Sequence, residues 1–246
     1  MAAAAPIIVF DCGYLFFYRY HATVKNLRLR KIEITPEIMK DSFLDHLDKQ
    51  IAKTVKKFKA GAVYFAMDVS RRDIWRTELF PDYKGTRPDA PDEMPDVSID
   101  LSEMYKRHGI VLGHKHLEAD DVIYMVAKLS KAPLKIITND KDILQVLSDD
   151  PSRSDGRLRA HIEIYDGGLK RIEGDPYMEL WTKILCGDKS DNIGRLLTKK
   201  KAMAAMESGD LDEYKDTLNY KLINMDMVPA KYQKEFTKTF EKLTKN

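Results

Sequence analysis

Three short apolar runs, each closed by an acidic residue, constrain the fold of this 246-residue chain more than any other feature. They read PIIVFD, AVYFAMD and LKIITND, and they end at Asp11, Asp68 and Asp140. Near-continuous apolar runs of this length are typical of strands that are buried on both faces, as in a parallel sheet. The pattern therefore predicts an α/β fold in which the three acids lie at the carboxyl ends of three strands.

Helical patterns separate these runs and dominate the last part of the chain. Apolar residues repeat at helical spacing over residues 35–59 and 119–129, and the first of these segments begins with Thr-Pro-Glu, a favoured helix start. We expect a mostly parallel central sheet flanked by helices within a core over residues 1–175, followed by a small helical subdomain over residues 176–246. Basic and aromatic residues, then a Pro-rich acidic piece, predict an exposed arch loop at about residues 71–100.

Acidic residues also occur elsewhere in positions that suit a shared site. In an open parallel sheet, ligands bind outside the carboxyl ends of the strands, so acids near these ends converge. Free carboxylates at a few ångströms repel one another, and a divalent cation removes this conflict. Ligation by oxygen alone suits Mg²⁺ or Mn²⁺, and a pair of such ions about 3.5–4 Å apart is an arrangement that hydrolyses phosphodiesters. Each acid taken singly also fits a turn or a helix cap, so the prediction depends on the combination. The further acids are Glu118, Asp120, Asp121, Asp142, Asp188 and Asp191.

The overall charge at first argues against a polyanionic partner, because 41 Lys and Arg against 39 Asp and Glu give a formal net charge of +2. Nine of the 39 acids belong to the predicted site, which leaves 30 acids against 41 bases elsewhere. We therefore expect an acidic pocket within a basic exterior that binds a phosphate backbone. With two cysteines and no apolar stretch near the ~18–20 residues that span a bilayer, we expect a soluble, intracellular protein without a membrane partner.

Five segments of the chain resemble, in order, the motifs of the 5′ nuclease family. This family comprises the flap endonucleases, the bacteriophage 5′–3′ exonucleases and the 5′ nuclease domain of bacterial DNA polymerase I. The resemblance implies the family's core sheet, which is similar to that of PIN-type ribonucleases, and a C-terminal helix-hairpin-helix. The matching segments, which run in register from about residue 7 to 193, are DCGYLFFYRYHA, YKGTRP, LEADDV, TNDKDILQ and GDKSDNI.

The resemblance also implies a metal site with two ions, Mg²⁺ or Mn²⁺. Lys84 and Arg87 would face the scissile phosphate and stabilise charge on its oxygens, so they are expected to be catalytic together with Asp68 and Asp142. The implied ligands of one ion are Asp11, Asp68, Glu118 and Asp120, and those serving the second, partly through water, are Asp121, Asp140, Asp142, Asp188 and Asp191.

The predicted DNA contacts lie on three segments. Aromatic residues near the cut can stack on unpaired bases, although aromatics at helical spacing are more often part of a core. After residue 193 the chain has one Gly where the family has several, so we expect a remodelled hairpin that binds duplex through point charges, without a potassium ion. The expected contacts are Tyr14, Phe17, Arg71, Arg72, Arg76, Tyr83, Lys84, Arg87, Arg195, Lys199, Lys200 and Lys201.

The sequence thus predicts a monomeric, divalent-metal-dependent 5′ nuclease of cellular, phage or viral replication or repair. Its expected partner is DNA with 5′ ends, flaps, nicks or gaps, with RNA:DNA hybrid as a further candidate and replication proteins as unidentified companions. Two alternatives stay open: a PIN-type ribonuclease and a non-catalytic DNA-junction-binding protein. The large acid set and the YKGTR segment weigh against the first, and the presence of every expected acid weighs against the second.

Overall fold

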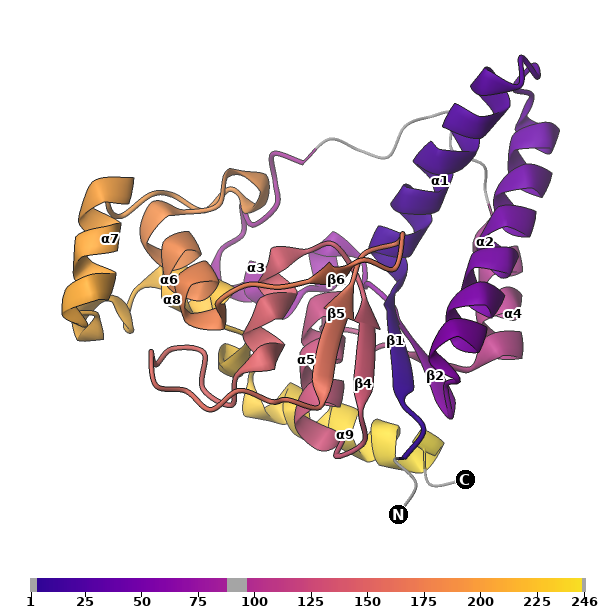
Figure 1. Cartoon of the computed structure of the whole chain (residues 1–246). Helices are drawn as coiled ribbons and strands as arrows, with labels where there is room; N and C mark the ends of the chain where they lie inside the picture. The colour runs from indigo at the N-terminus through magenta and orange to yellow at the C-terminus, as the bar shows by residue number, and fades with distance from the viewer. Residues whose placement is uncertain (1–3, 88–96, 245–246) are drawn as a thin grey trace.

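The computed structural model describes residues 4–87 and 97–244 and contains a six-stranded sheet with the order β3-β2-β1-β4-β5-β6 (Figure 1). All neighbouring strands are parallel except β5 and β6. This sheet confirms the predicted mostly parallel α/β fold. Its strands are β1 (Ile7–Asp11), β2 (Ala62–Ala66), β3 (Ile110–Leu112), β4 (Leu134–Ile137), β5 (Ile162–Tyr165) and β6 (Arg171–Ile172).

Helices cover both faces of the sheet. Alternate residues of β1 point to opposite faces, as a pleated strand requires, so Val9 joins one buried apolar cluster while Ile8 and Phe10 join another. The first cluster contains residues of α5 (Ala119–Leu129) and α9 (Ala230–Thr244), and the second contains residues of α1 (Cys12–Leu29), α2 (Pro36–Phe58) and α4 (Ser98–His108).

Capping residues set the starts of the two long N-terminal helices. The Asp11 carboxylate accepts a hydrogen bond from the backbone N–H of Tyr14, so the acid that ends β1 also caps α1. The Thr35 hydroxyl accepts one from the N–H of Ile38 at the start of α2, which ends at Lys59 in the left-handed region (φ 50°). The helix predicted from residue 35 to 59 is thus confirmed.

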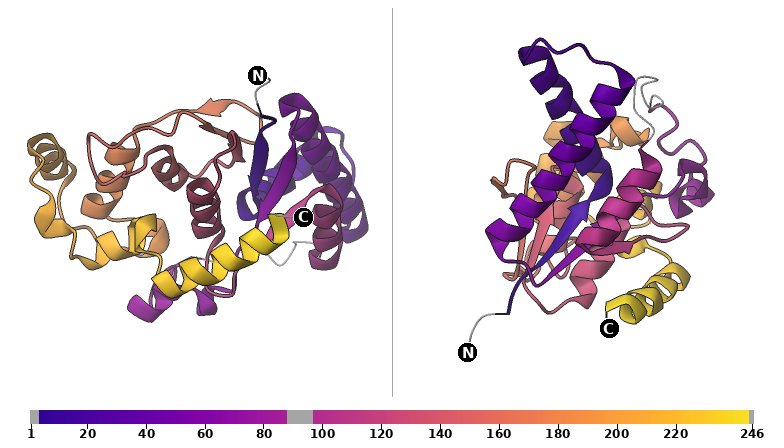
Figure 2. Two further views of the ribbon diagram at one scale, coloured as in Figure 1. Left: turned by 90° about the horizontal axis from the view of Figure 1, so that it is seen from below. Right: turned by 90° about the vertical axis from the view of Figure 1, so that its right-hand side faces the viewer.

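A separate group of helices lies at the end of the molecule away from α1 and α2 (Figure 1). These helices share a third apolar cluster with the region of α3 (Trp75–Leu79). The last helix of the predicted subdomain over residues 176–246, α9, lies apart from this group and packs beside α5 on the sheet (Figure 2). The helices of the group are α6 (Pro176–Cys186), α7 (Lys199–Ser208) and α8 (Leu218–Ile223).

Short 3₁₀ helices connect several of these elements. Within the described ranges, no helix is long and apolar enough to cross a membrane. The Pro-rich part of the predicted arch loop, residues 88–96, lies outside the described residues. The 3₁₀ helices are η1 (Arg71–Asp73), η2 (Lys141–Leu147), η3 (Lys189–Asp191), η4 (Asp212–Tyr214) and η5 (Met225–Met227).

Candidate active site

Four acids, here called the pocket carboxylates, meet at the carboxyl ends of the strands: Asp11, Asp68, Asp120 and Asp140. They come from the end of β1, the loop after β2, the first turn of α5 and the loop after β4. Because β1 pairs with both β2 and β4, the three strand ends lie side by side. The acids line a cavity of about 370 Å³, together with Gly13, Tyr14, Phe17, Lys84, Arg87, Ala119 and Asn139.

Hydrogen bonds from the backbone and from a threonine hydroxyl orient two of the pocket carboxylates. Asp11 accepts hydrogen bonds from the backbone N–H of Tyr14 at 3.0 Å and from the Thr138 hydroxyl at 2.7 Å. Asp68 accepts one from the backbone N–H of Ala119, the first residue of α5, at 2.9 Å. Thr138 was not among the predicted site residues, although its position at the end of β4, just before an acid, was the available signal.

The pocket carboxylates are destabilised as anions. Burial, and to a smaller extent the nearby Asp68 and Asp140 charges, raise the pKa of Asp11 to about 6 against the lowering effect of its hydrogen bonds. Burial and then Glu118 raise the pKa of Asp68, while burial, Asp140 and Asp11 raise that of Asp120. Desolvation and like charge both favour the protonated form, so a cation in this cavity would relieve a real conflict.

Lys84 and Arg87 bind a second pair of acids at the edge of the cavity. The Lys84 ammonium forms an ion pair with Glu118 and lies 4.0 Å from Asp191, and Arg87 forms an ion pair with Asp191. The Tyr83 hydroxyl lies between the same two acids, 3.1 Å from Glu118 and 3.0 Å from Asp191. Burial lowers the pKa of Lys84, but the two carboxylates outweigh it and raise that pKa above its ordinary value. The lysine is therefore fully charged.

Lys183 on α6 joins two of the three remaining predicted ligands. Its ammonium lies 2.6 Å from Asp142 and 2.8 Å from Asp188. Burial raises the pKa of Asp142 to about 6 despite the lysine. For Asp188, burial is outweighed by hydrogen bonds from Lys183 and Ser190, which lower the pKa to about 2. Lys183 was not among the predicted site residues, and its place one helical turn before the GDKSDN segment was the signal that could have found it.

Arg76 and Asp121, predicted as a DNA contact and as a metal ligand, bind each other in a buried network. Arg76 is 3% exposed and binds both oxygens of Asp121, at 2.8 Å each, and Glu118 at 2.9 Å. Trp75 donates a third hydrogen bond to Asp121, at 3.0 Å. Both oxygens of Asp121 thus accept hydrogen bonds inside this network, and the Arg76 guanidinium is committed to the same buried acids. Tyr83, also predicted as a DNA contact, is likewise buried.

The other predicted DNA contacts lie at or near the surface. Phe17 is 45% exposed at the edge of the carboxylate cavity, while Tyr14 is half-buried and its hydroxyl accepts a hydrogen bond from the N–H of Gly167. Arg195 and Lys199 line a cavity of about 980 Å³ between the link from α6 to α7 and Thr86. The exposed basic residues of the prediction are Arg71, Arg72, Arg195, Lys199, Lys200 and Lys201.

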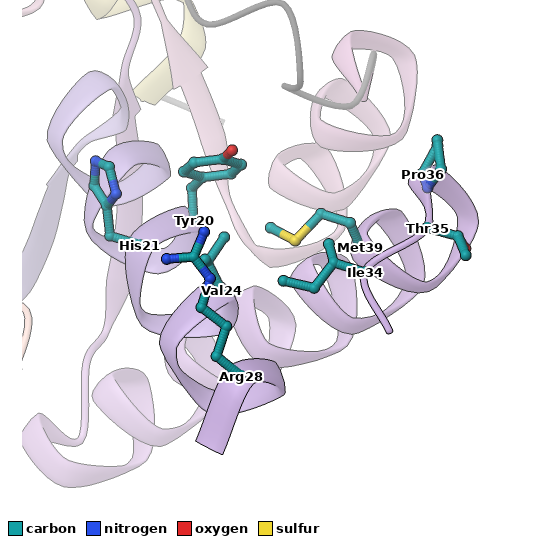
Figure 3. Close-up of a pocket in the computed structure, with 8 residues that line it drawn as sticks. All are labelled: Tyr20, His21, Val24, Arg28, Ile34, Thr35, Pro36 and Met39. Atoms are coloured by element: carbon teal, nitrogen blue, oxygen red, sulfur yellow. The ribbon is translucent and has the colours of Figure 1, made fainter. Parts of the chain in front are cut away.

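Another cavity, of about 610 Å³, lies between the outer part of α1 and the start of α2 (Figure 3). Tyr20, His21, Val24 and Arg28 line it from α1, and Ile34 and Met39 line it on the side of α2. No acidic residue lines it. This cavity is therefore distinct from the site that the carboxylates form.

The sequence of the site region matches a known family. The profile of the 5′–3′ exonuclease N-terminal resolvase-like domain matches residues 6–169, which hold β1 to β5 and all four pocket carboxylates. The chain belongs to this 5′–3′ exonuclease family.

Relatives of this chain include a DNA polymerase, an exonuclease and a flap endonuclease. DNA polymerase I of Lactococcus lactis is 28% identical over an alignment of 208 residues that covers 75% of this chain and 22% of the polymerase. The 5′–3′ exonuclease of Streptomyces coelicolor is 27% identical over 83% of the chain and 72% of that protein. Flap endonuclease Xni of Cronobacter sakazakii is 30% identical over 68% of the chain and 62% of that protein. The chain thus spans about a fifth of the polymerase.

Solved structures of bacteriophage T5 proteins share the fold over nearly the whole chain. A T5 protein co-crystallised with metal ions has a TM-score of 0.66 at 16% identity, covering 97% of this chain and 99% of its own. A T5 flap endonuclease in complex with DNA and metal ions has a TM-score of 0.59, covering 98% and 100%. The likeness therefore includes the C-terminal helices that follow the matched domain.

The pocket carboxylates fit a hard divalent cation in their chemistry, although not as a finished coordination shell. They offer oxygen alone, they are close together, and their raised pKa values mark a deficit of positive charge. In residues 4–87 and 97–244, however, no three acidic, His or Cys side chains already stand in a metal-binding arrangement. Glu118, Asp142, Asp188 and Asp191 are instead held by lysine and arginine.

We expect the metal-free protein to lose thermal stability as pH rises from about 4 to about 7. Burial raises the pKa of Asp11 and Asp142 from the ordinary 3.8 to about 6, so the folded state binds more protons than the unfolded state between these values. The stability gained from these protons is present at low pH and is lost as pH passes about 6. Calorimetric melting temperatures in chelator measure this effect, and a melting temperature that rises over the same interval contradicts it.

We also expect Arg76→Met to destabilise the fold by about 3–5 kcal/mol, because it leaves the buried Asp121 without its cation and Glu118 with Lys84 alone. Urea unfolding measures the loss. Arg72→Met removes the same charge from an exposed position four residues earlier and should change stability by less than about 0.5 kcal/mol. Equal effects of the two substitutions would refute the structural role of Arg76.

Proposed function

We propose that the protein is a divalent-metal-dependent, structure-specific 5′ nuclease that hydrolyses DNA phosphodiesters near 5′ ends or at junctions of single and double strands. The observation that carries the proposal is the meeting of four carboxylates at the ends of β1, β2, β4 and α5, with Lys84 and Arg87 on the same cavity. The names of the relatives support it, because an exonuclease and a flap endonuclease are among them.

Two ions, Mg²⁺ or Mn²⁺, are the proposed cofactors. Asp11, Asp68 and Asp120 would hold the first, with Glu118 beside them, and Asp142, Asp188 and Asp191 would serve the second. Asp140, expected from the sequence at the second ion, lines the same cavity as the first group and is therefore proposed to join it. When bound, such ions polarise the phosphate and lower the pKa of water. The T5 structures support this assignment, since these proteins were crystallised with metal ions.

Side chains of the protein itself would bind and orient the substrate at the cavity. Lys84 and Arg87 lie on the cavity that holds the carboxylates, so they are placed to contact a phosphate there and to stabilise negative charge on its oxygens. Phe17, exposed at the cavity edge, would stack on an unpaired base next to that phosphate. Hydrolysis would leave a 5′-phosphate on the downstream strand.

Basic residues outside the cavity would hold the duplex. Arg195, Lys199, Lys200 and Lys201 are exposed around the link from α6 to α7, and Arg71 and Arg72 are exposed before α3. Such contacts release counterions, so binding should weaken steeply with salt. The T5 flap endonuclease that shares the fold was solved in complex with DNA, which supports the same partner for this chain.

In Mg²⁺, the protein should cut a 5′-flap or nicked DNA duplex, and Asp68→Asn should lower the single-turnover rate by orders of magnitude while DNA affinity changes far less. The reason is that Asp68 is a proposed ion ligand and makes no proposed contact with the duplex. Gel mapping of 5′- and 3′-labelled flaps reports the cut position, and matched RNA flaps distinguish a ribonuclease. Asp210→Asn, an exposed acid on the helical group, is the control and should keep the full rate. Failure to cut any flapped, nicked or gapped substrate would refute the nuclease assignment.

Gly13→Ala should weaken Mn²⁺ binding by about tenfold or more, as loss of a ligand's support commonly does. A Cβ at this position would lie 2.7 Å from Asp68 Oδ2, so the carboxylate must move. Paramagnetic resonance of free Mn²⁺ measures the affinity. Gly113→Ala is the matched control, because its nearest atom, Met67 Cβ, would be 3.6 Å away. Unchanged Mn²⁺ affinity in Gly13→Ala would show that the ion does not use Asp68.

A further inference from the structure

The ammonium group of Lys183 occupies a position in which a metal ion is expected. The Lys183 ammonium lies 2.6 Å from Asp142 Oδ2 and 2.8 Å from Asp188 Oδ2, and it bridges η2 and the link after α6. Two carboxylates joined by one cation in this way resemble the environment of a bound ion, with the ammonium in the central position. Asp140, two residues from Asp142, adds a third negative charge nearby.

The pocket carboxylates and the Asp142–Asp188 pair differ in whether a lysine or arginine neutralises them. In residues 4–87 and 97–244, no Lys or Arg forms an ion pair within 4.0 Å of the pocket carboxylates Asp11, Asp68, Asp120 and Asp140. The Asp142 and Asp188 pair already holds its cation. One group is therefore open to an ion, and the other is occupied by a side chain.

We propose that Lys183 is the resident counter-ion of the Asp142–Asp188 pair and must withdraw before a divalent ion binds there. An ion that contacts both carboxylates at the ~2.1 Å of a Mg²⁺–oxygen bond would take the place of the ammonium, and the two cations repel strongly at such distances. The inference deepens the proposed function, on which it rests, because it makes the second ion conditional.

The withdrawal is physically available to this side chain. Lys183 is 27% exposed, and a lysine is a point charge on a flexible four-carbon stem that can rotate toward solvent. An ammonium released beside the cavity would find its best new partner in a phosphate group. The free protein should therefore bind one ion well and a second one weakly, and bound nucleic acid should strengthen the second.

Removal of the lysine tests the proposal without any nuclease assay. Mn²⁺ titrations of the free protein, followed by paramagnetic resonance, should give two unequal affinities. Lys183→Met should tighten the weaker one by about tenfold or more, a usual size for coupling between two binding events. Adding Asp188→Asn to Lys183→Met should abolish the gain, which would locate the ion at this pair.

Lys141→Met is the matched control. Lys141 lies next to Asp142 in sequence, but its ammonium is exposed and faces Glu179 at 3.6 Å. The substitution removes one positive charge from the neighbourhood without emptying the proposed position, so the Mn²⁺ affinities should stay near the unmodified values. An equal gain in both variants would refute displacement in favour of a general charge effect. An unchanged or weakened second affinity in Lys183→Met would refute the proposal outright.

Melting curves separate this role from a purely structural ion pair. Lys183→Met and Lys183→Gln should melt below the unmodified protein in chelator, because two acids are left unpaired, and saturating Mn²⁺ should restore them to the unmodified level. A deficit that persists in Mn²⁺ would mean that Lys183 only stabilises the fold. The outcome is independent of catalysis: a protein that cuts no DNA can still show displacement, and an active nuclease can fail to show it.

Discussion

Mutual repulsion among the acids at one end of the sheet is the constraint on which the rest of this structure depends. The fold brings nine predicted ligands into one region, and the structure divides them among separate partners. Arg76 neutralises Asp121, Lys84 binds Glu118, and Lys183 binds Asp142 and Asp188. In the described part of the chain, the four pocket carboxylates have no such cation partner, and the pKa values of Asp11, Asp68 and Asp120 are accordingly raised. A cation site is thus left open by the way the other acids are satisfied.

The same pairing attaches the helical group to the sheet. Arg76 donates a hydrogen bond to the carbonyl of Leu222 in α8 at 2.7 Å, and the Lys84 backbone N–H donates one to the carbonyl of Asp191 at 3.0 Å. Residues that neutralise the acids therefore also hold the segments that would contact the duplex. Because a buried charge that loses its partner is costly, the helical group cannot shift far without disturbing the carboxylates.

The sheet and the pocket could be predicted from the sequence because their signals are local. Each of β1, β2 and β4 is a short apolar run, and the acid that closes the run lies at or just after the strand end whatever the rest of the chain does. The fate of Arg76 could not be predicted in this way. It stands in a basic, aromatic segment like a phosphate contact, and only the approach of Asp121 makes it a core residue. The position of α9 was unpredictable for a similar reason: Tyr232, Phe236 and Phe240 define an apolar stripe, but not the surface that the stripe covers.

Charge pairing also connects ion binding with phosphate binding. In this structure Lys84 and Arg87 are committed to Glu118 and Asp191, and a cation that is neutralised by carboxylates attracts a phosphate only weakly. A metal ion bound near Glu118 and Asp191 would weaken their ion pairs with Lys84 and Arg87, because the positive charges repel one another. In the proposed function, Lys84 and Arg87 would then be available to phosphate oxygens in the same cavity. The formal net charge of +2 conceals this arrangement, since the acids are gathered inside while Arg195, Lys199 and Lys200 remain outside. In the proposed function, ions would therefore serve the chain in two ways, by filling the open carboxylate pocket and by freeing cations that the protein already carries.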